Sequence, residues 1–273
     1  MSGFEVVVPC STSNLGAGFD AIGIALGGPR VRARVERTDE PLRIVALSGE
    51  GRDELPRDAT NRVLVAAREA AIFAGRDPAD LFGDVTVETT IPLSRGLGSS
   101  ASAALAGALI ADELLGGVLG QAGVLAVAVA LEGHPDNVVP ALLGGAQVAI
   151  RDAFGAVQSC PIRLAAKLWA ALFVAALGQG RPELLGEAMA DKLHQPARTK
   201  LMPWLPALIA AARAAGADGA ALSGAGTTVC ALCAPDKAAE VAAGMKAAAE
   251  KLGVAGRALA VEAAVAGARV ENL

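Results

Sequence analysis

The densest run of residues that could do chemistry is a glycine- and serine-rich loop in the first half of the chain. Its members are Pro92, Leu93, Ser94, Arg95, Gly96, Leu97, Gly98, Ser99, Ser100, Ala101 and Ser102. Alternating β-branched residues predict a strand over 85–91, and an Ala- and Leu-rich run predicts a helix over 103–115. Unpaired N–H groups at a helix N-terminus attract anions, and glycine lets a phosphate approach the backbone. The loop therefore predicts a phosphate site, with the Ser99 and Ser100 hydroxyls available for a phosphate oxygen or a metal ion.

Two familiar phosphate motifs do not fit this loop. Residues 96–101 match the G-x-G-x-x-A pattern of dinucleotide folds, but Pro92 separates the strand from the glycines, and the acids Asp112 and Glu113 come too early. A Walker A loop requires Gly-Lys-Ser/Thr, and no lysine lies here. What remains is a phosphate loop of a third kind or, as the simpler alternative, a turn closed by a serine cap.

A second polar cluster follows the helix predicted over 125–131. It has the sequence EGHPDN over 132–137 and includes one of only two histidines. The Glu132 carboxylate is a hard oxygen ligand of the kind that Mg²⁺ prefers, and Mg²⁺ also bridges to phosphate. Alternatively, Asp136 or Asn137 caps a helix that begins near Val138. The residues alone leave both interpretations open.

Three further segments combine small polar groups with glycine or charge. Residues 9–20 follow a strand predicted over 4–8 and carry Asn14 and Asp20, which suit a substrate amine or hydroxyl, although this composition is also typical of a long irregular turn. Arg198 suits a carboxylate bound by two hydrogen bonds, or is a solvated residue at a helix end. Residues 222–229 predict two strands joined by a glycine loop, either a plain hairpin or a third loop of the site.

The composition limits the classes of function. With 273 residues, 53% of them hydrophobic and 19% charged, the chain can bury a substantial core in one large or two ordinary domains. A net charge of −4, the lack of a basic block and only 3% aromatic residues argue against nucleic acid as a partner. The 18 uncharged residues 114–131 contain Gly116, Gly117 and Gly120. They predict two buried helices joined by a glycine turn, not a membrane span.

The remaining elements follow from periodicity. Strands are predicted over 29–36, 42–47 and 146–150, and a helix over 61–74. A shift of composition at 151–161 marks a domain boundary. After it, helices over 164–177, 182–193, 203–215 and 237–252 and a final strand over 257–265 predict an α+β second half.

The four cysteines are expected to be reduced structural thiols. Cys230 and Cys233 have C-x-x-C spacing, but positions i and i+3 of a strand face opposite ways, which makes joint ligation awkward. Cys10 and Cys160 have no such partner nearby in the sequence. No signal peptide is evident at the N-terminus, so a reducing, cytoplasmic compartment is expected.

Taken together, the three glycine loops at 9–20, 92–102 and 222–229 resemble those of the GHMP kinases. Residues 132–137, 194–198 and 267–270 extend the likeness to the homoserine kinase branch, so it covers nearly the whole chain. The resemblance implies a two-domain α+β fold, with an N-terminal domain over 1–153 that contains a left-handed crossover and a ferredoxin-like C-terminal domain over 154–273. It implies a cytoplasmic enzyme, expected to be a homodimer, that converts L-homoserine to O-phospho-L-homoserine with ATP in threonine biosynthesis.

The resemblance also implies roles for residues. It puts ATP on the loop 92–102 and Mg²⁺ near Ser99 and Glu132. The substrate residues are Asn14, Asp20, His134, Asn137, Arg198 and Gly224, with Asn137 and Arg198 as the catalytic candidates. Asp20 would pair with the substrate ammonium and Arg198 with its carboxylate. Asn137 stands where relatives such as mevalonate kinase carry an aspartate base. Because an amide cannot accept the proton, positioning and charge neutralisation would carry most of the rate.

The chain departs from the family pattern in two places. Family members carry a T-x-x-x-R segment followed by L-P at the start of the second domain, and here this segment, roughly a dozen residues or more with its crossover, is missing after Pro161. Thr227 stands where the third loop usually has proline. Two alternatives therefore accompany the main interpretation. One is a GHMP kinase for another small alcohol, for which Asp20 and Arg198 are the discriminating residues. The other is a ligand-binding member that has lost catalysis.

Overall fold

A computed structural model of the chain describes residues 3–16, 18–151, 157–161, 173, 176–177, 179–191 and 194–273. The helix predicted over 164–177 falls mostly outside this part, although Phe173, Ala176 and Leu177 are helical. The site of the missing T-x-x-x-R segment, directly after Pro161, also lies outside the described residues.

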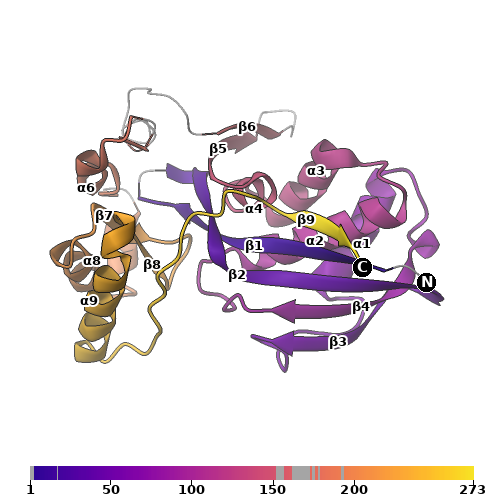
Figure 1. The fold of residues 1–273 in the computed structure, drawn as a ribbon, viewed down its shortest axis with the longest axis horizontal. Helices are drawn as coiled ribbons and strands as arrows, with labels where there is room; N and C mark the ends of the chain where they lie inside the picture. Colours follow the sequence, from indigo (N-terminus) through magenta and orange to yellow (C-terminus); the bar gives the residue numbers. More distant parts are fainter. Residues whose placement is uncertain are drawn as a thin grey trace.

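One mixed sheet organises most of the described chain (Figure 1). Its main path, from one edge to the other, runs through β3 (Arg43–Gly49), β4 (Phe82–Thr89), β2 (Gly18–Pro41), β1 (Phe4–Asn14) and β9 (Arg269–Asn272). Strand β5 (Ala146–Arg151) pairs with β2 and with β6 (Val157–Pro161). All these pairs are antiparallel except β3 and β4, which are parallel and are connected through helix α1 (Arg62–Phe73) and the short η1 (Pro78–Asp80).

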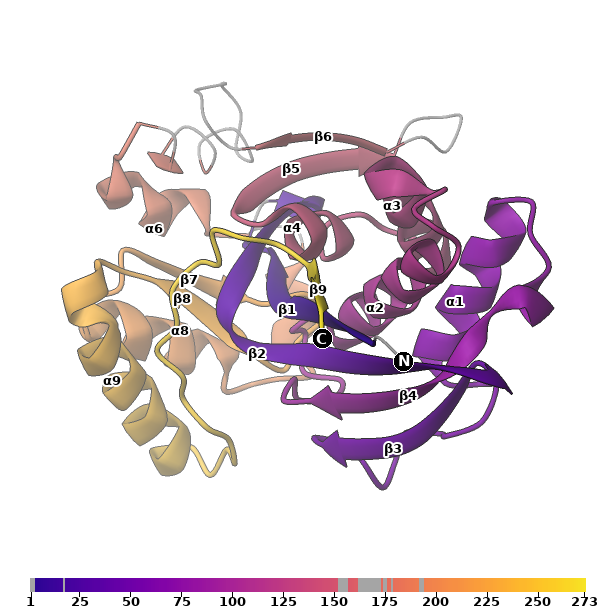
Figure 2. The same ribbon diagram turned by 45° about the vertical axis from the view of Figure 1, so that its right-hand side comes forward.

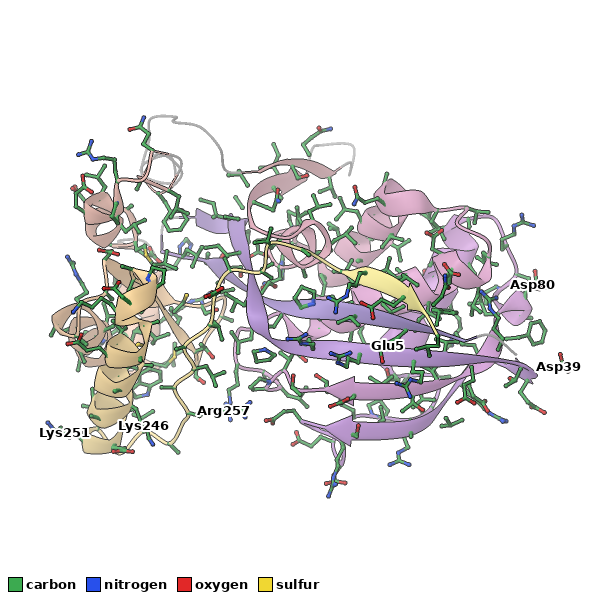
Figure 3. The ribbon with its side chains drawn as sticks, viewed as in Figure 1. Glu5, Asp39, Asp80, Lys246, Lys251 and Arg257 are labelled. Atoms are coloured by element: carbon green, nitrogen blue, oxygen red, sulfur yellow. The ribbon has the colours of Figure 1, made fainter. Side chains whose placement is uncertain are left out.

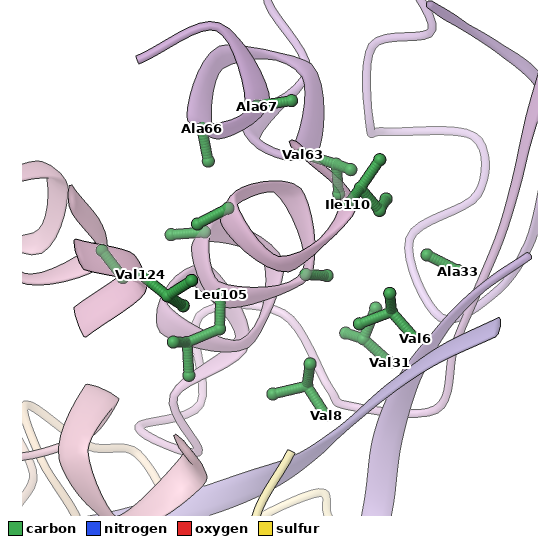
Figure 4. Packing of buried hydrophobic residues seen from close by; sticks show 14 of the residues in the cluster. Val6, Val8, Val31, Ala33, Val63, Ala66, Ala67, Leu105, Ile110 and Val124 are labelled. Carbon is green, nitrogen blue, oxygen red and sulfur yellow. The ribbon is translucent and has the colours of Figure 1, made fainter. Parts of the chain in front are cut away.

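Four helices cover one face of this sheet: α1, α2 (Ser99–Leu114), α3 (Gly120–Glu132) and α4 (Val138–Leu143) (Figure 2). Val6 and Val31 of the sheet point toward Leu105 and Ile110 of α2 in the core (Figure 4). Helices α1 and α2 approach closely because the residues between them are small. A Cβ at Gly107 of α2 would lie only 2.1 Å from the carbonyl oxygen of Val63 in α1.

The uncharged stretch 114–131 forms the end of α2 and most of α3, as the sequence predicts. Gly116 and Gly117, both with positive φ, make the turn between the two helices. Among the described residues, no helix has the length and apolar character needed to cross a bilayer.

The opposite face of the sheet is charged. Glu5, near the start of β1, forms ion pairs with Arg32 at 2.8 Å and Arg34 at 3.6 Å (Figure 3). Arg32 and Arg34 therefore form ion pairs on the solvent-facing side of the sheet, as expected for a strand with a charged outer side.

The second half of the chain packs as a smaller layer beside the large sheet (Figure 1). Its described elements are η2 (Pro182–Leu184), α6 (Leu185–Ala188), α7 (Gln195–Thr199), α8 (Leu205–Ala214), β7 (Gly219–Leu222), β8 (Val229–Leu232), η3 (Pro235–Lys237) and α9 (Ala238–Lys251). Strands β7 and β8 are antiparallel, and α8 packs against them and against α9. Within the described residues, strands β7 and β8 are the part of the expected ferredoxin-like sheet that is formed.

Three sequence predictions need correction. The strand over 4–8 continues to Asn14, and the irregularity predicted there is confined to register shifts after Pro9 and Ser13 and a turn at 15–16. The helix over 182–193 ends at Ala188. The final strand over 257–265 is wrong: the segment is extended and exposed but meets β2 only at the Leu26–Ala263 bridge, and the last strand is β9. Alternation indicates an extended backbone, but a strand also needs a neighbour to pair with along its length.

The thiols of Cys10, Cys230 and Cys233 are free, in agreement with their expected structural role. Burial raises the pKa of Cys10 to about 12 and that of Cys230 to about 11, so both stay protonated and inert. The thiol of Cys160 lies outside the described part.

Candidate active site

The phosphate loop reaches helix α2 through glycines in the left-handed region. Helix α2 begins at Ser99, and its N-cap is Gly98, with φ +67°. Gly96 and Ser94 also have positive φ, +74° and +55°. Since Gly98 has no side chain, no side-chain cap covers the first N–H groups of α2. A serine-capped turn is therefore not what the chain forms, and these donors are available to an anion.

The two glycines are also required by the space around them. A Cβ at Gly98 would lie 2.5 Å from Ser11 Oγ and 2.9 Å from Asn137 Oδ1. A Cβ at Gly96 would lie 2.1 Å from the carbonyl oxygen of Ser223. The neighbours belong to the first loop, the third loop and the polar cluster after α3, so the phosphate loop is in contact with all of them.

Hydrogen bonds join the three glycine loops into one body. Ser223 Oγ donates to the Gly96 carbonyl oxygen at 2.6 Å, and its hydroxyl lies 2.7 Å from Thr12 Oγ1. The backbone N–H of Gly224 donates to the Ser13 carbonyl oxygen at 3.0 Å. Thr12, Ser13 and Ser223 are buried. The segment 222–229 is thus a hairpin and, at the same time, a third loop of the site.

Not every residue of the predicted phosphate loop faces outward. Leu97, Ala101 and Ser102 are buried, and Ser102 Oγ donates to the Pro9 carbonyl oxygen at 3.0 Å, which ties α2 to β1. Leu93 packs against Gly51, and a Cβ added at Gly51 would lie 2.1 Å from Leu93 Cδ1. These side chains support the loop, and its exposed or half-buried members are left for a ligand.

Asn137 lies at the centre of the arrangement. Its Oδ1 accepts a hydrogen bond from Ser11 Oγ at 2.9 Å, and its Nδ2 donates to Ser13 Oγ at 2.9 Å. Although Asn137 occupies the N-cap position of α4, its side chain makes no capping bond. The buried amide therefore holds the first loop against the α3–α4 connection.

His134 and Asp136 form a pair in the same connection. His134 Nδ1 lies 2.6 Å from Asp136 Oδ1, which also accepts the backbone N–H of Asn137 at 3.0 Å. Asp136 is buried. Its hydrogen bond raises the pKa of His134, against the effect of burial, and the carboxylates of Asp20 and Glu132 add to the increase. Asp20 and His134 are therefore near enough to influence each other.

Asn14, Arg198 and Gly224 line one small pocket. The others around it are Gly16, Asp191, His194, Gln195 and Leu222. Arg198 Nη1 donates to the Gly224 carbonyl oxygen at 2.5 Å, and Asn14 Oδ1 accepts the backbone N–H of Asp20 at 2.8 Å. The pocket thus brings together residues that the sequence analysis selected from three distant segments.

Glu132 and Ser100 offer the hard oxygens that Mg²⁺ prefers. Ser100 Oγ donates to Glu132 Oε1 at 2.7 Å at the start of α2. The described residues contain no group of three or more His, Cys, Asp and Glu side chains that could hold a metal. One carboxylate with a neighbouring hydroxyl fits Mg²⁺ that takes its other ligands from nucleotide phosphates and water. The hydroxyl that touches Glu132 is that of Ser100, and a role for Ser99 stays a prediction.

Several residues of the site were missed in the sequence. Ser11, Thr12, Ser13 and Ser223 lie inside the quoted loops, but small hydroxyls in loops carry no sign of a long-range partner. Arg62 donates from Nη2 to Glu132 Oε1 at 2.5 Å. Its only signal is a basic residue in the first turn of the helix predicted over 61–74, where the helix dipole disfavours it.

The comparisons with known proteins agree with this geometry. The model of the GHMP kinases N terminal domain matches residues 61–145, and that of the GHMP kinases C terminal domain matches residues 173–251. This chain belongs to the GHMP kinase family. As a member of this kinase family, it is an ATP-dependent small-molecule kinase, and the two-domain α+β fold expected from the sequence is confirmed. The domain boundary at 153/154 stays a prediction.

Within the GHMP kinases, the curated relatives that match this chain include homoserine kinases. The one from Moorella thermoacetica is 38% identical over 84% of this chain and 86% of its own length. The one from Picosynechococcus sp. is 34% identical over 93% of this chain and 94% of its own length. The crystal structure of the Cytophaga hutchinsonii homoserine kinase has a TM-score of 0.83 at 23% identity, covering 98% and 97% of the two chains.

The absence of a T-x-x-x-R segment after Pro161 stays a prediction from the sequence.

Proposed function

We propose that this GHMP kinase transfers the terminal phosphoryl group of ATP to the side-chain hydroxyl of L-homoserine, giving O-phospho-L-homoserine and ADP. One observation carries the proposal. The third loop touches the phosphate loop through Ser223 and Gly96, and its next residue, Gly224, accepts the hydrogen bond of Arg198. A guanidinium suited to an amino-acid carboxylate is therefore one peptide away from the contact with the phosphate loop. The identity of the curated relatives supports the same substrate.

On this proposal, the exposed backbone of the loop 92–102 and the first N–H groups of α2 bind the ATP phosphates. The helix dipole and the fixed N–H groups stabilise the negative charge that spreads over the phosphoryl oxygens during transfer. Glu132, with Ser99 or Ser100, would hold Mg²⁺, which neutralises further charge on those oxygens. The protein contributes a charge-complementary surface that is already in place before ATP binds.

The acceptor is held by its two charged groups. Arg198 pairs with the carboxylate of L-homoserine, and Asp20 pairs with its ammonium. Asn14 is linked to Asp20, and His134 lies close to it, so both are placed to orient the amino end. Two fixed charges at one end of a short chain leave the hydroxyl at the other end free to point toward the phosphate loop.

No side chain is needed as a strong base. Asn137 cannot accept a proton, and its amide is already engaged by Ser11 and Ser13. In a loose transition state, the bond from the terminal phosphorus to the β–γ bridging oxygen breaks while the bond to the homoserine oxygen forms, and the hydroxyl proton leaves late. Positioning by Asn137 and Arg198, together with charge neutralisation at the phosphate loop, therefore supplies most of the catalytic contribution of the protein.

The same proposal includes a cytoplasmic enzyme of threonine biosynthesis that acts as a homodimer. A catalytically impaired, ligand-binding member of the family is the second candidate, and it is favoured by the T-x-x-x-R segment that the sequence lacks after Pro161.

Coupled measurement of ADP release tests the proposal. L-Homoserine is compared with L-serine, which is one methylene shorter, with L-threonine, and with mevalonate, which lacks the ammonium group, each with and without Mg²⁺. The expected result is Mg²⁺-dependent turnover that is fastest with L-homoserine. Equal turnover with mevalonate would indicate another small alcohol as substrate, and ATP binding without transfer to any acceptor would indicate the impaired member.

A further inference from the structure

Arg62 lies where its own helix does not favour a cation. It is the first residue of α1, and the preceding Asn61 fixes the start of this helix: its side chain accepts the Val63 N–H at 3.0 Å and donates to the Pro56 carbonyl oxygen at 2.6 Å. A positive side chain at a helix N-terminus faces the positive end of the helix dipole. The position of Arg62 therefore needs another explanation.

Glu132 has the opposite mismatch. It is the last residue of α3, where a carboxylate faces the negative end of the dipole. Arg62 Nη2 resolves both mismatches, since it donates to Glu132 Oε1 at 2.5 Å and to the Leu131 carbonyl oxygen at 2.8 Å. The guanidinium thus neutralises the carboxylate and satisfies a carbonyl at the end of α3.

The pair reaches the phosphate loop through Ser100. Glu132 Oε1 accepts both the guanidinium and the Ser100 hydroxyl, so the oxygen already has two donors. The Glu132 side chain is only 9% exposed, whereas that of Arg62 is 37% exposed. Arg62 Nε is buried without a hydrogen-bond partner. The carboxylate is fixed in place, while the guanidinium is incompletely satisfied and has solvent on one side, so it is the partner that is able to leave.

We propose that Arg62 is a positioning residue that serves as the resident counter-cation of Glu132. It holds the carboxylate at the start of α2 in the absence of a divalent cation, and it competes for Oε1 when one arrives. The proposal rests on the metal-binding role of Glu132 in the proposed function. Because a guanidinium and a divalent cation repel each other at one oxygen, the free chain binds the metal weakly. The phosphates of ATP add ligands and negative charge, so the metal is taken up together with the nucleotide.

Binding of Mn²⁺ without nucleotide tests this proposal, with free Mn²⁺ followed by electron paramagnetic resonance. Arg62→Gln removes the charge and keeps a polar side chain, and Arg62→Met is a second neutral variant should the first fold poorly. We expect either one to bind Mn²⁺ about tenfold more tightly than the wild type, a coupling of the usual size between two sites. Arg62→Lys keeps the charge and should stay near the wild type. Arg68→Gln, on the same helix and bonded to Ala59, is the matched control and should not change binding.

Glu132→Gln separates failure of this proposal from failure of the proposed function. It should abolish the tight Mn²⁺ binding of Arg62→Gln and weaken Mn²⁺ binding by the wild type in the presence of ATP. Unchanged or weaker Mn²⁺ binding by both neutral variants would overturn the role of Arg62 while leaving the metal site intact. Mn²⁺ binding that is indifferent to Glu132→Gln would overturn both.

Discussion

Around the phosphate loop, the contacts are made by backbone groups, glycines and buried hydroxyls, whereas around the acceptor pocket they are made by charged and amide side chains that lie partly in solvent. Ser223 and Gly96 represent the first kind, and Arg198 and Gln195 the second. A site for phosphate needs donors in a fixed geometry, which the backbone supplies. A site for a particular amino acid needs charges at a particular separation, which only side chains supply. The two regions should therefore respond differently to substitution.

The largest effect is expected from Gly98→Val on the phosphate side. A β-branched residue at φ +67° is strained, and its Cβ would meet Ser11 Oγ and Asn137 Oδ1. Strain and clash of about 3 kcal/mol correspond to about a hundredfold loss or more in ATP affinity, measured by calorimetry. Gly116→Val is the control, because Gly116 also has positive φ but no atom within 4 Å of the added Cβ. Equal ATP affinity in the two variants would show that the phosphate loop does not bind the nucleotide.

The next effect is expected from Arg198→Met on the acceptor side. Loss of a charged hydrogen-bonding partner for the substrate carboxylate costs about 2–3 kcal/mol, so KM for L-homoserine should increase about 30- to 150-fold. KM for ATP should stay within about twofold of wild type, because Arg198 donates its hydrogen bond to Gly224 of the third loop. Steady-state kinetics in both substrates measures the split, with Arg181→Met, which removes an exposed ion pair with Glu183, as control. Equal changes in the two KM values would mean that the two sides are not separable.

A smaller effect is expected from Ser223→Ala, at the contact between the two sides. The substitution removes the buried donor to Gly96 and a partner of Thr12, which should lower the free energy of unfolding by about 1–3 kcal/mol. Thermal denaturation measures it, and Ser48→Ala at an exposed position of β3 should cause almost no change. A Tm equal to that of wild type would show that the hydrogen bonds of Ser223 between the loops do not stabilise the folded protein.

The smallest effect concerns protonation of His134. Its pKa is raised above 6.5 by Asp136, so the imidazolium–carboxylate pair stabilises the fold fully below pH 6.5 and loses that contribution as pH rises through the raised value. Asp136→Asn keeps an acceptor for the Asn137 N–H but removes the charge, so the pKa should fall. NMR titration of the imidazole, assigned with His134→Gln, measures the change. A pKa that is unaffected by Asp136→Asn would contradict this origin.

The comparison also explains what could be predicted from the sequence. The phosphate loop could be predicted because its chemistry is encoded locally, in glycines between a strand and a helix. The pocket residues Asn14 and Arg198 could be selected as candidates from their own chemistry, but only the resemblance to a family grouped them with Gly224, since their separation in the chain exceeds any local pattern. Ser11, Thr12 and Arg62 were missed because their partners, Asn137, Ser223 and Glu132, lie far away in sequence.

The fold shows the same limit. Helices α2 and α9 were predicted within a few residues, because α2 is rich in the strong helix formers Ala and Leu and α9 has a local apolar period. The strand predicted over 257–265 failed because alternation indicates only an extended backbone. Its pairing depends on β2, more than 200 positions earlier in the chain. The pairing of β9 with β1 likewise could not be read from either strand alone.

The most direct test of the central claim is ³¹P NMR of the wild-type chain with ATP, Mg²⁺ and L-homoserine. The claim is that a phosphate loop built from backbone groups binds ATP while an acceptor pocket built from side chains holds L-homoserine for phosphoryl transfer in this GHMP kinase. The predicted result is a new phosphomonoester resonance that grows together with ADP and is absent when L-homoserine is omitted. ATP that stays intact, or ADP that accumulates only with inorganic phosphate, would contradict it.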